Sequence, residues 1–178
     1  MTKVPRPRYD HLKVDRYATG ALQYSRGCPF QCEFCDIIVI FGRKPRVKDP
    51  DQFVAELDDM RRAGFHSAFI VDDNFISRTR YTQELLEALV PLHQAGKLPP
   101  WSAETTLNVA QDEELLNLFA EAGCVTLIVG IESISQAKLE AMAKGINFCM
   151  TYQEALDRIH ARGLTVVGNF IVGFDTDT

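Results

Sequence analysis

Apolar positions along the chain follow two spacings, one typical of buried strands and the other of amphipathic helices. Short, nearly continuous apolar runs alternate with longer segments in which apolar residues recur every three or four positions. The strand-like runs are residues 20–25, 67–71, 101–107, 125–131 and 164–174, and the helical segments are residues 49–64, 78–94, 112–122, 135–144 and 151–162. Five strands separated by helices predict a parallel sheet with crossover connections, which is an α/β fold.

The helix boundaries carry signals of their own. Asp49 or Asp51 stands where a side chain can cap the first long helix, and Gly64 follows its last turn. Thr151 and Glu154 have the spacing of a capping box at the start of the last helix. These signals support the helical segments that the apolar spacing predicts.

The strands themselves are almost without polar residues, as in T-L-I-V-G-I over residues 126–131. Such strands fit a sheet that is covered on both faces or curled into a barrel. The chain shows no repeat and no linker, so we predict one domain over residues 20–178, preceded by a lead-in segment over residues 1–19. In parallel α/β folds, ligands bind beyond the carboxyl ends of the strands.

Polar side chains gather at the carboxyl end of every predicted strand. In chain order they are Cys28, Cys32 and Cys35, then Asp72, Asp73 and Asn74, then Glu104 and Thr105, then Glu132 and Ser133, and finally Asp175 and Thr176. A single polar residue at a strand end often only caps a helix or solvates a turn. Because the topology brings all five strand ends to one rim, the set as a whole predicts a binding site.

Composition and charge narrow the class of protein. The 178 residues are 46% hydrophobic and 24% charged, as in an ordinary globular domain, and the net charge of −5 argues against a nucleic-acid partner. The two basic stretches, Lys3–Arg8 and Arg43–Lys48, are interpreted as solvated loops. No apolar run approaches the ~20 residues of a membrane span, and the first residues lack the apolar core of a signal peptide. We therefore predict a cytoplasmic protein.

Three of the five cysteines, Cys28, Cys32 and Cys35, lie within eight residues. Thiols stay reduced in the cytosol, so this grouping indicates metal or redox chemistry rather than a disulfide. A structural zinc site takes four protein ligands, but Cys124 and Cys149 stand alone and none of the four histidines has the spacing of a ligand pair. An iron–sulfur cluster held by three cysteines would instead leave one iron open to a substrate amine and carboxylate.

The spacing Cys28-x-x-x-Cys32-x-x-Cys35, with Phe34 before the last cysteine, resembles the signature of the radical S-adenosylmethionine (SAM) superfamily. A longer string, C-P-F-Q-C-E-F-C-D-I followed by G-R-K-P-R, is similar to radical SAM proteins that usually carry a cobalamin-binding domain, including hopanoid C-2 methylases. The segments F-I-V-D-D-N-F, G-C-V-T-L-I-V-G-I-E-S and F-I-V-G-F-D-T-D-T extend this similarity from about residue 5 to residue 178.

The resemblance implies a partial (β/α) barrel, of which this chain carries about five βα units and stops before the sixth strand. It implies that Cys28, Cys32 and Cys35 bind a [4Fe-4S] cluster and that SAM occupies the fourth iron. Reductive cleavage of SAM would then give a 5′-deoxyadenosyl radical, for methylation of an unactivated carbon in a lipid-like or small-molecule substrate. The expected partners are that substrate and an electron donor such as flavodoxin or ferredoxin. Cobalamin, where it is used, would be bound by a domain outside this chain.

The resemblance also gives roles to further rim residues. Phe34 resembles the aromatic residue whose backbone lies near the adenine of SAM. Asp72-Asp73-Asn74 replaces the Gly-Gly-Glu that often holds the methionyl amine, and Asp73, with Asn74 beside it, is the predicted acceptor for that amine.

Four later residues complete the predicted cofactor site. Glu104 and Glu132 are expected at the ribose hydroxyls or the methionyl end of SAM, with a salt bridge or a helix cap as the alternative for each. Ile171 and Gly173 resemble the strand that packs on adenine, where glycine permits close approach of the backbone.

Two alternatives to a methylase remain open at this point. One is a radical SAM core with another chemistry, such as methylthiolation or cyclisation. The other is a module that binds an iron–sulfur cluster or zinc without catalysing a reaction. The residues do not identify the substrate.

Overall fold

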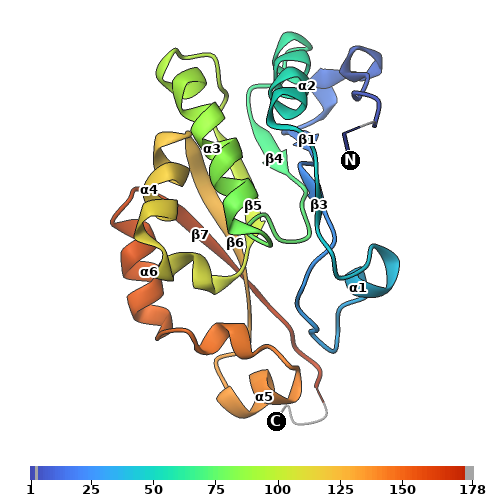
Figure 1. The fold of residues 1–178 in the computed structure, drawn as a ribbon. Coiled ribbons are helices and arrows are strands. Elements are labelled where there is room, and N and C mark those ends of the chain that lie inside the picture. The colour runs from blue at the N-terminus through green and yellow to red at the C-terminus, as the bar shows by residue number, and fades with distance from the viewer. Residues whose placement is uncertain (3, 175–178) are drawn as a thin grey trace.

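The computed structural model describes residues 1–2 and 4–174, and a five-stranded parallel sheet forms its centre (Figure 1). Each strand pairs only with parallel neighbours. In sheet order the strands are β1 (Gly20–Leu22), β4 (Ala68–Ile70), β5 (Trp101–Thr105), β6 (Cys124–Glu132) and β7 (Thr165–Phe170). The predicted α/β class and its parallel sheet are therefore confirmed.

Helices connect successive strands of the sheet. They are α2 (Pro50–Arg62), α3 (Thr79–Gln94), α4 (Glu113–Glu121), α5 (Gln136–Ala141) and α6 (Tyr152–His160), with a short α1 (Ile37–Ile40) that the apolar spacing did not predict. The predicted caps are present, because the Asp49 side chain accepts the Asp51 N–H and the Thr151 hydroxyl accepts the Glu154 N–H. Figure 1 shows α3, α4 and α6 along one side of the sheet and α1 on the other.

The two faces of the sheet differ in what covers them. In β5, Trp101, Ala103 and Thr105 are buried, whereas Ser102 and Glu104 on the opposite face are half-buried. The buried face meets the helices, and there Trp101 packs against the rings of Phe75 and Phe119. The helix-facing side is thus the hydrophobic core, and the opposite side is left to the candidate site.

The predicted strand over residues 20–25 is wrong in its second half. β1 ends at Leu22, and Ser25–Arg26 leaves the sheet as β2, which pairs antiparallel with β3 (Arg46–Val47). The reason is a contact with a residue distant in sequence, because the N–H groups of Tyr24 and Ser25 donate to the Asp72 carboxylate instead of a neighbouring strand.

Two predicted elements in the C-terminal half also extend too far toward the C-terminus. The helix predicted over residues 135–144 ends at Ala141, and a 3-10 helix, η4 (Gly145–Phe148), follows it. The strand predicted over residues 164–174 ends at Phe170, which pairs with Glu132, the last residue of β6, after a register shift in that strand. Asp175 and Thr176 lie outside the described residues.

The lead-in segment packs on the domain through Tyr9. Its ring is buried beside Phe65, and its hydroxyl donates to the Ala21 carbonyl at 2.7 Å. Within the described residues, no helix combines the length and the apolar character needed to cross a membrane. The division into residues 1–19 and 20–178 stays a prediction.

Candidate functional site

A cavity of about 430 Å³ lies on the face of the sheet opposite the helices, at the carboxyl ends of the strands. One wall is the segment that carries the three clustered cysteines, residues 27–36, here called the cysteine loop. The floor includes Phe69 of β4, Val71 directly after that strand, and Ile128 of β6. Of the predicted site residues, those that line this cavity are Cys28, Cys32, Phe34, Cys35, Asp73, Asn74, Glu104 and Glu132.

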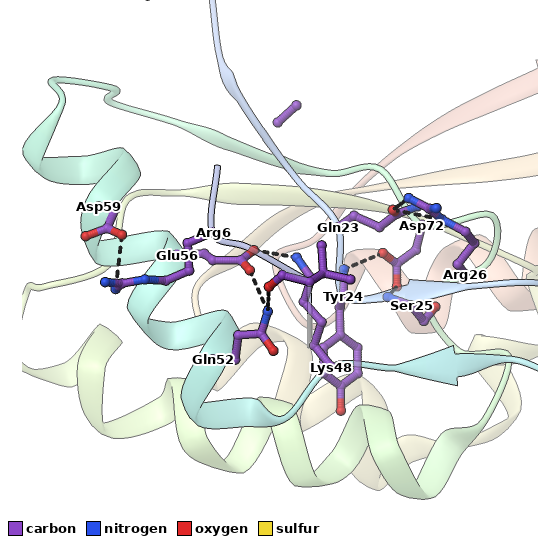
Figure 2. A network of polar contacts seen from close by, with 12 residues as sticks. Arg6, Gln23, Tyr24, Ser25, Arg26, Lys48, Gln52, Glu56, Asp59 and Asp72 are labelled. Atoms are coloured by element: carbon purple, nitrogen blue, oxygen red, sulfur yellow. Dashed lines mark hydrogen bonds and ion pairs between the residues drawn. The ribbon is translucent and has the colours of Figure 1, made fainter. Parts of the chain in front are cut away.

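The base of the cysteine loop is held by the two aspartates that follow β4. Asp72 accepts the N–H groups of Tyr24 and Ser25 at 2.7 and 2.8 Å, as Figure 2 shows, and Asp73 accepts the Gly27 N–H at 2.7 Å. Burial raises the pKa of Asp72 to about 7, although the hydrogen bonds from residues 24 and 25 act in the opposite direction. Asp72 therefore directs the chain out of the sheet and into the loop.

A buried ion pair lies next to Tyr24, where the chain leaves the sheet. Lys48 donates to Glu56, and Gln52 donates to the second oxygen of that carboxylate (Figure 2). The Lys48 backbone N–H also donates to the Tyr24 carbonyl at 2.9 Å. The prediction that residues 43–48 form a solvated loop is therefore wrong at Lys48, which is buried.

Gly27 lets the cysteine loop lie against the following loop. Its φ of 101° lies in the left-handed region, and a Cβ placed there would be 2.9 Å from the Gly42 carbonyl oxygen and 3.2 Å from that of Lys44. Any larger residue at this position would push the two backbones apart. The cysteine loop and residues 42–44 thus form one packed unit.

Cys28, Cys32 and Cys35 are free thiols that are half-buried in the cavity wall. Burial raises the pKa of Cys28 and of Cys32, and the nearby charge of Lys144 acts in the opposite direction on Cys32. Within the described residues, no three His, Cys, Asp or Glu side chains surround a single point as ligands of one metal ion would. A [4Fe-4S] cluster takes each thiolate on a different iron, so three sulfurs along one wall of a cavity fit its requirements.

The two remaining cysteines lie away from this wall. Cys124 is buried in β6, and burial raises the pKa of its thiol to about 12, as expected of an inert core residue. Cys149 follows η4 and does not line the cavity. Both agree with the prediction that they stand apart from the cluster.

The acidic side of the cavity consists of Asp73 and Glu104. Burial raises the pKa of Glu104, and the negative charge of Asp73 acts in the same direction, which places the two carboxyl groups near each other. Among the described residues, the Glu104 carboxylate has neither a hydrogen bond nor an ion pair, so the predicted alternatives of a salt bridge or a helix cap are not what the structure shows there. The Asn74 side chain, in contrast, donates to Thr106 and accepts the Ile76 N–H.

The opposite side of the cavity holds a buried ion pair that the sequence did not reveal. The Lys144 Nζ lies 3.1 Å from Glu132 Oε1 and 5.7 Å from the centre of the Phe34 ring. Glu132 thus forms a salt bridge, the alternative already considered for it. Gly130 makes the room, because a Cβ there would lie 2.3 Å from the same carboxylate oxygen.

The backbone beneath this pair is held in an uncommon conformation. Glu132 has φ 62°, and the Asn147 amide donates to the carbonyls of Gly130 and Ile131 at 3.1 and 2.9 Å. Nothing in the sequence marked Lys144, because a lysine before a glycine at a predicted helix end is the usual partner of a helix terminus. Its contact with Glu132 depends on the turn that η4 makes.

The residues predicted to meet adenine are only partly brought together. Phe34 is 40% exposed at the cavity mouth, beneath Lys144. Ile171 and Gly173 follow β7 and do not line the cavity, whereas Asn169 of that strand does. The role of each in cofactor binding stays a prediction.

Comparison with known proteins gives the family. Residues 22–178 match the model of the radical SAM superfamily. The chain is 42% identical to the hopanoid C-2 methylase of Rhodopseudomonas palustris over 100% of its length and 34% of the relative's. It is 41% identical to an uncharacterized methyltransferase of Synechocystis sp. over 98% of its length and 33% of the relative's. It therefore spans about a third of these relatives.

The fold also matches a solved structure. The radical S-adenosylmethionine methyltransferase TsrM from Kitasatospora setae, solved with cobalamin and a [4Fe-4S] cluster, superposes with a TM-score of 0.81 at 19% identity, over 100% of this chain and 35% of TsrM. This agreement confirms the predicted partial-barrel architecture. On its sequence and its fold, the chain belongs to the radical SAM superfamily.

Proposed function

We propose that this chain is the core of a radical SAM methyltransferase, and that its cavity holds a [4Fe-4S] cluster and SAM side by side. The observation that carries the proposal is the composition of one cavity. Three thiols line this cavity together with four carboxyl side chains, those of Asp72, Asp73, Glu104 and Glu132, and with the Lys144 ammonium. Few other ligands require this combination of soft, acidic and basic groups.

Cys28, Cys32 and Cys35 are the residues that would hold the cluster. The hydrogen bonds of Asp72 and Asp73 at the base of the loop orient that wall before any iron is bound. Binding would release the thiol protons, because thiolates are the iron ligands.

The charges around the cavity match the two charged groups of SAM. The methionyl ammonium fits beside Asp73 and Glu104, where two neighbouring carboxyl groups favour a cation. The methionyl carboxylate fits beside Lys144, whose single ionic partner within the described residues is Glu132. Phe34 at the mouth offers an aromatic surface for the adenine end. A cluster held by Cys28, Cys32 and Cys35 would supply the one-electron reduction that cleaves bound SAM.

Methylation is proposed as the reaction because the relatives are named as a methylase and a methyltransferase. The substrate is proposed to be a lipid-like or small molecule, and cobalamin is proposed to bind outside this chain. A longer protein that contains this core, supplied with SAM labelled in its methyl group, should transfer the label to its substrate. A product that gains sulfur together with the labelled methyl group, or one that gains a new ring without label, would indicate one of the other radical SAM reactions instead.

The cluster can be tested on this chain directly. After anaerobic reconstitution with iron and sulfide, the wild type should carry four irons and four sulfides per chain, as a [4Fe-4S] cluster requires. The triple variant Cys28→Ala/Cys32→Ala/Cys35→Ala should lose both, whereas the control Cys124→Ala/Cys149→Ala should keep them. A full complement of iron and sulfide in the triple variant would contradict the proposal.

A further inference from the structure

An exposed group of cations lies on the outer side of the cysteine loop. It consists of Arg43, Lys44, Arg46 and Arg78, here called the basic face, and within the described residues none of the four forms an ion pair. Their contacts hold them without neutralising them, since Arg43 and Arg46 donate to backbone carbonyls and Arg78 lies 4.9 Å from the centre of the Tyr81 ring. In a chain of net charge −5, this is a local excess of positive charge.

The basic face is attached directly to the cysteine loop. Arg43 donates to the Pro29 carbonyl at 3.2 Å, and the backbones of Gly27 and residues 42–44 are in contact. Arg46 belongs to β3, which pairs with β2 immediately before the loop. The basic residues therefore keep a fixed position relative to the three cysteines.

The cysteine loop is a thin wall between this face and the cavity. Cys28 and Phe30 line the cavity, while Pro29 between them lines a separate surface hollow together with Arg43, Lys44 and Arg78. The acidic residues of the loop, Glu33 and Asp36, do not line that hollow. A molecule seated on the basic face would thus be separated from the cavity by one layer of backbone.

We propose that the basic face is the docking surface for a small acidic one-electron carrier protein that reduces the cluster. The proposal rests on the proposed function, because it needs a cluster behind the loop. One electron passes from the reduced carrier to the oxidised cluster, so the carrier is oxidised by one electron, the cluster is reduced by one, and no bond is made or broken. Charge complementarity would hold the carrier over Pro29, whose neighbours Cys28 and Phe30 line the cavity.

A redox protein fits this face better than a nucleic acid does. The cations gather in one small area beside the candidate cluster, and the remainder of the chain is acidic, which would repel an extended phosphate backbone. Of the described residues, Phe41 and Tyr81 are the aromatic residues that contact these cations. An arginine already covers each ring, Arg26 over Phe41 and Arg78 over Tyr81, which leaves neither free to stack on a base.

The test compares two triple variants with reconstituted clusters. Arg43→Gln/Lys44→Gln/Arg78→Gln removes charge from the basic face, and Lys13→Gln/Arg16→Gln/Lys97→Gln removes the same charge at the amino ends of β1 and β5, where these cations are exposed and have no ion pair among the described residues. Reduced flavodoxin serves as the acidic carrier, photoreduced deazaflavin serves as a small uncharged reductant, and stopped-flow absorbance follows the reduction of the cluster.

With flavodoxin at low ionic strength, the first variant should be reduced about tenfold more slowly than the wild type, and added salt should remove most of that difference. The control variant should stay within about twofold of the wild type, and deazaflavin should reduce all three proteins at equal rates. These results together would support the docking surface.

Two results would overturn the inference. Equal flavodoxin rates for the wild type and the first variant would show that the basic face does not receive the carrier. An RNA oligonucleotide that binds the wild type but not the first variant, while the two proteins have equal flavodoxin rates, would show that the basic face binds a nucleic acid instead. A wild type that assembles no cluster would overturn the proposed function as well, and iron analysis before the kinetics separates that case.

Discussion

Two buried lysine–glutamate pairs, one behind the cysteine loop and one inside the cavity, have the same chemistry and different surroundings. Both carboxylate oxygens of Glu56 have a protein partner, because Lys48 donates to one and Gln52 donates to the other. Around Lys144 and Glu132 only Oε1 is paired within the described residues, and the pair faces the cavity. The side-chain exposures are 5% and 0% for the first pair, and 8% and 9% for the second.

The first arrangement serves the stability of the fold, whereas the second can serve the binding of a ligand. A pair whose groups are all satisfied by the protein fixes the chain and offers nothing to a ligand. A pair with an open acceptor and an adjoining cavity can exchange partners when a charged ligand arrives, at the expense of a weaker contribution to the fold.

The largest effect is expected at the satisfied pair. Lys48→Met would leave the Glu56 charge buried without a cation, which typically destabilises a protein by about 3–5 kcal/mol. Urea denaturation of the wild type and the variant measures the loss. As a matched control, Arg80→Ala at the exposed Arg80–Glu84 pair should lose no more than about 0.5 kcal/mol. Equal losses in the two variants would show that burial does not distinguish these pairs.

The next effect concerns the hydrogen bonds that direct the cysteine loop. Asp72→Asn keeps the size of the side chain and one acceptor oxygen, but its amide group would face one of the two donor N–H groups. A loss of about 1–3 kcal/mol at pH 8 is expected for the unpaired group. The iron bound after reconstitution should fall as well, because the loop loses its fixed direction. Full iron content at reduced stability would show that the loop is oriented by other contacts.

A smaller loss of stability is expected at the cavity pair. Lys144→Met leaves Glu132 beside a cavity that water can enter, so its effect should be less than half that of Lys48→Met. The same variant should weaken the response of the reduced cluster to SAM, since the basic group for the methionyl carboxylate is gone. A loss as large as that of Lys48→Met, with an unchanged response to SAM, would make Lys144 a structural residue only.

The last effect is a pH dependence from Asp72. Its folded-state pKa of about 7 lies above the ordinary value near ~3.9, so folding favours the protonated form. The resulting stability is fully present below pH ~4 and is lost as the pH rises through about 7. The difference in unfolding free energy between the wild type and Asp72→Asn should therefore be larger at pH 4.5 than at pH 8. A difference that grows with pH would mean that the two N–H donors outweigh burial and keep Asp72 ionised.

Those parts of the molecule that depend on residues close together in the chain could be predicted from the sequence. The strands, the caps at Asp49 and Thr151 and the three clustered cysteines follow from local patterns, and the family follows from motifs. The break of the first strand did not, because it depends on Asp72, which is distant in sequence and pulls two N–H groups away from the sheet.

The same limit explains the polar residues of the cavity. Glu104 could be placed because it ends a strand whose direction is predictable. Lys144 could not, because its contact with Glu132 passes through η4 and a register shift in β6 that leave no pattern in the sequence. In the basic stretch beside the cysteine loop, Arg43, Lys44 and Arg46 are exposed as predicted. The burial of Lys48 could not be predicted, because its partners Tyr24 and Glu56 lie on other elements.

The central claim is that one cavity holds the cluster and SAM in contact, and the EPR spectrum of the reduced cluster tests it most directly. Wild-type protein with a full complement of iron and sulfide is reduced with deazaflavin and measured with and without saturating SAM. We predict that SAM changes the g values and the line shape, because its amine and carboxylate replace the ligand at the open iron. An unchanged spectrum in folded protein with an intact cluster would contradict the account.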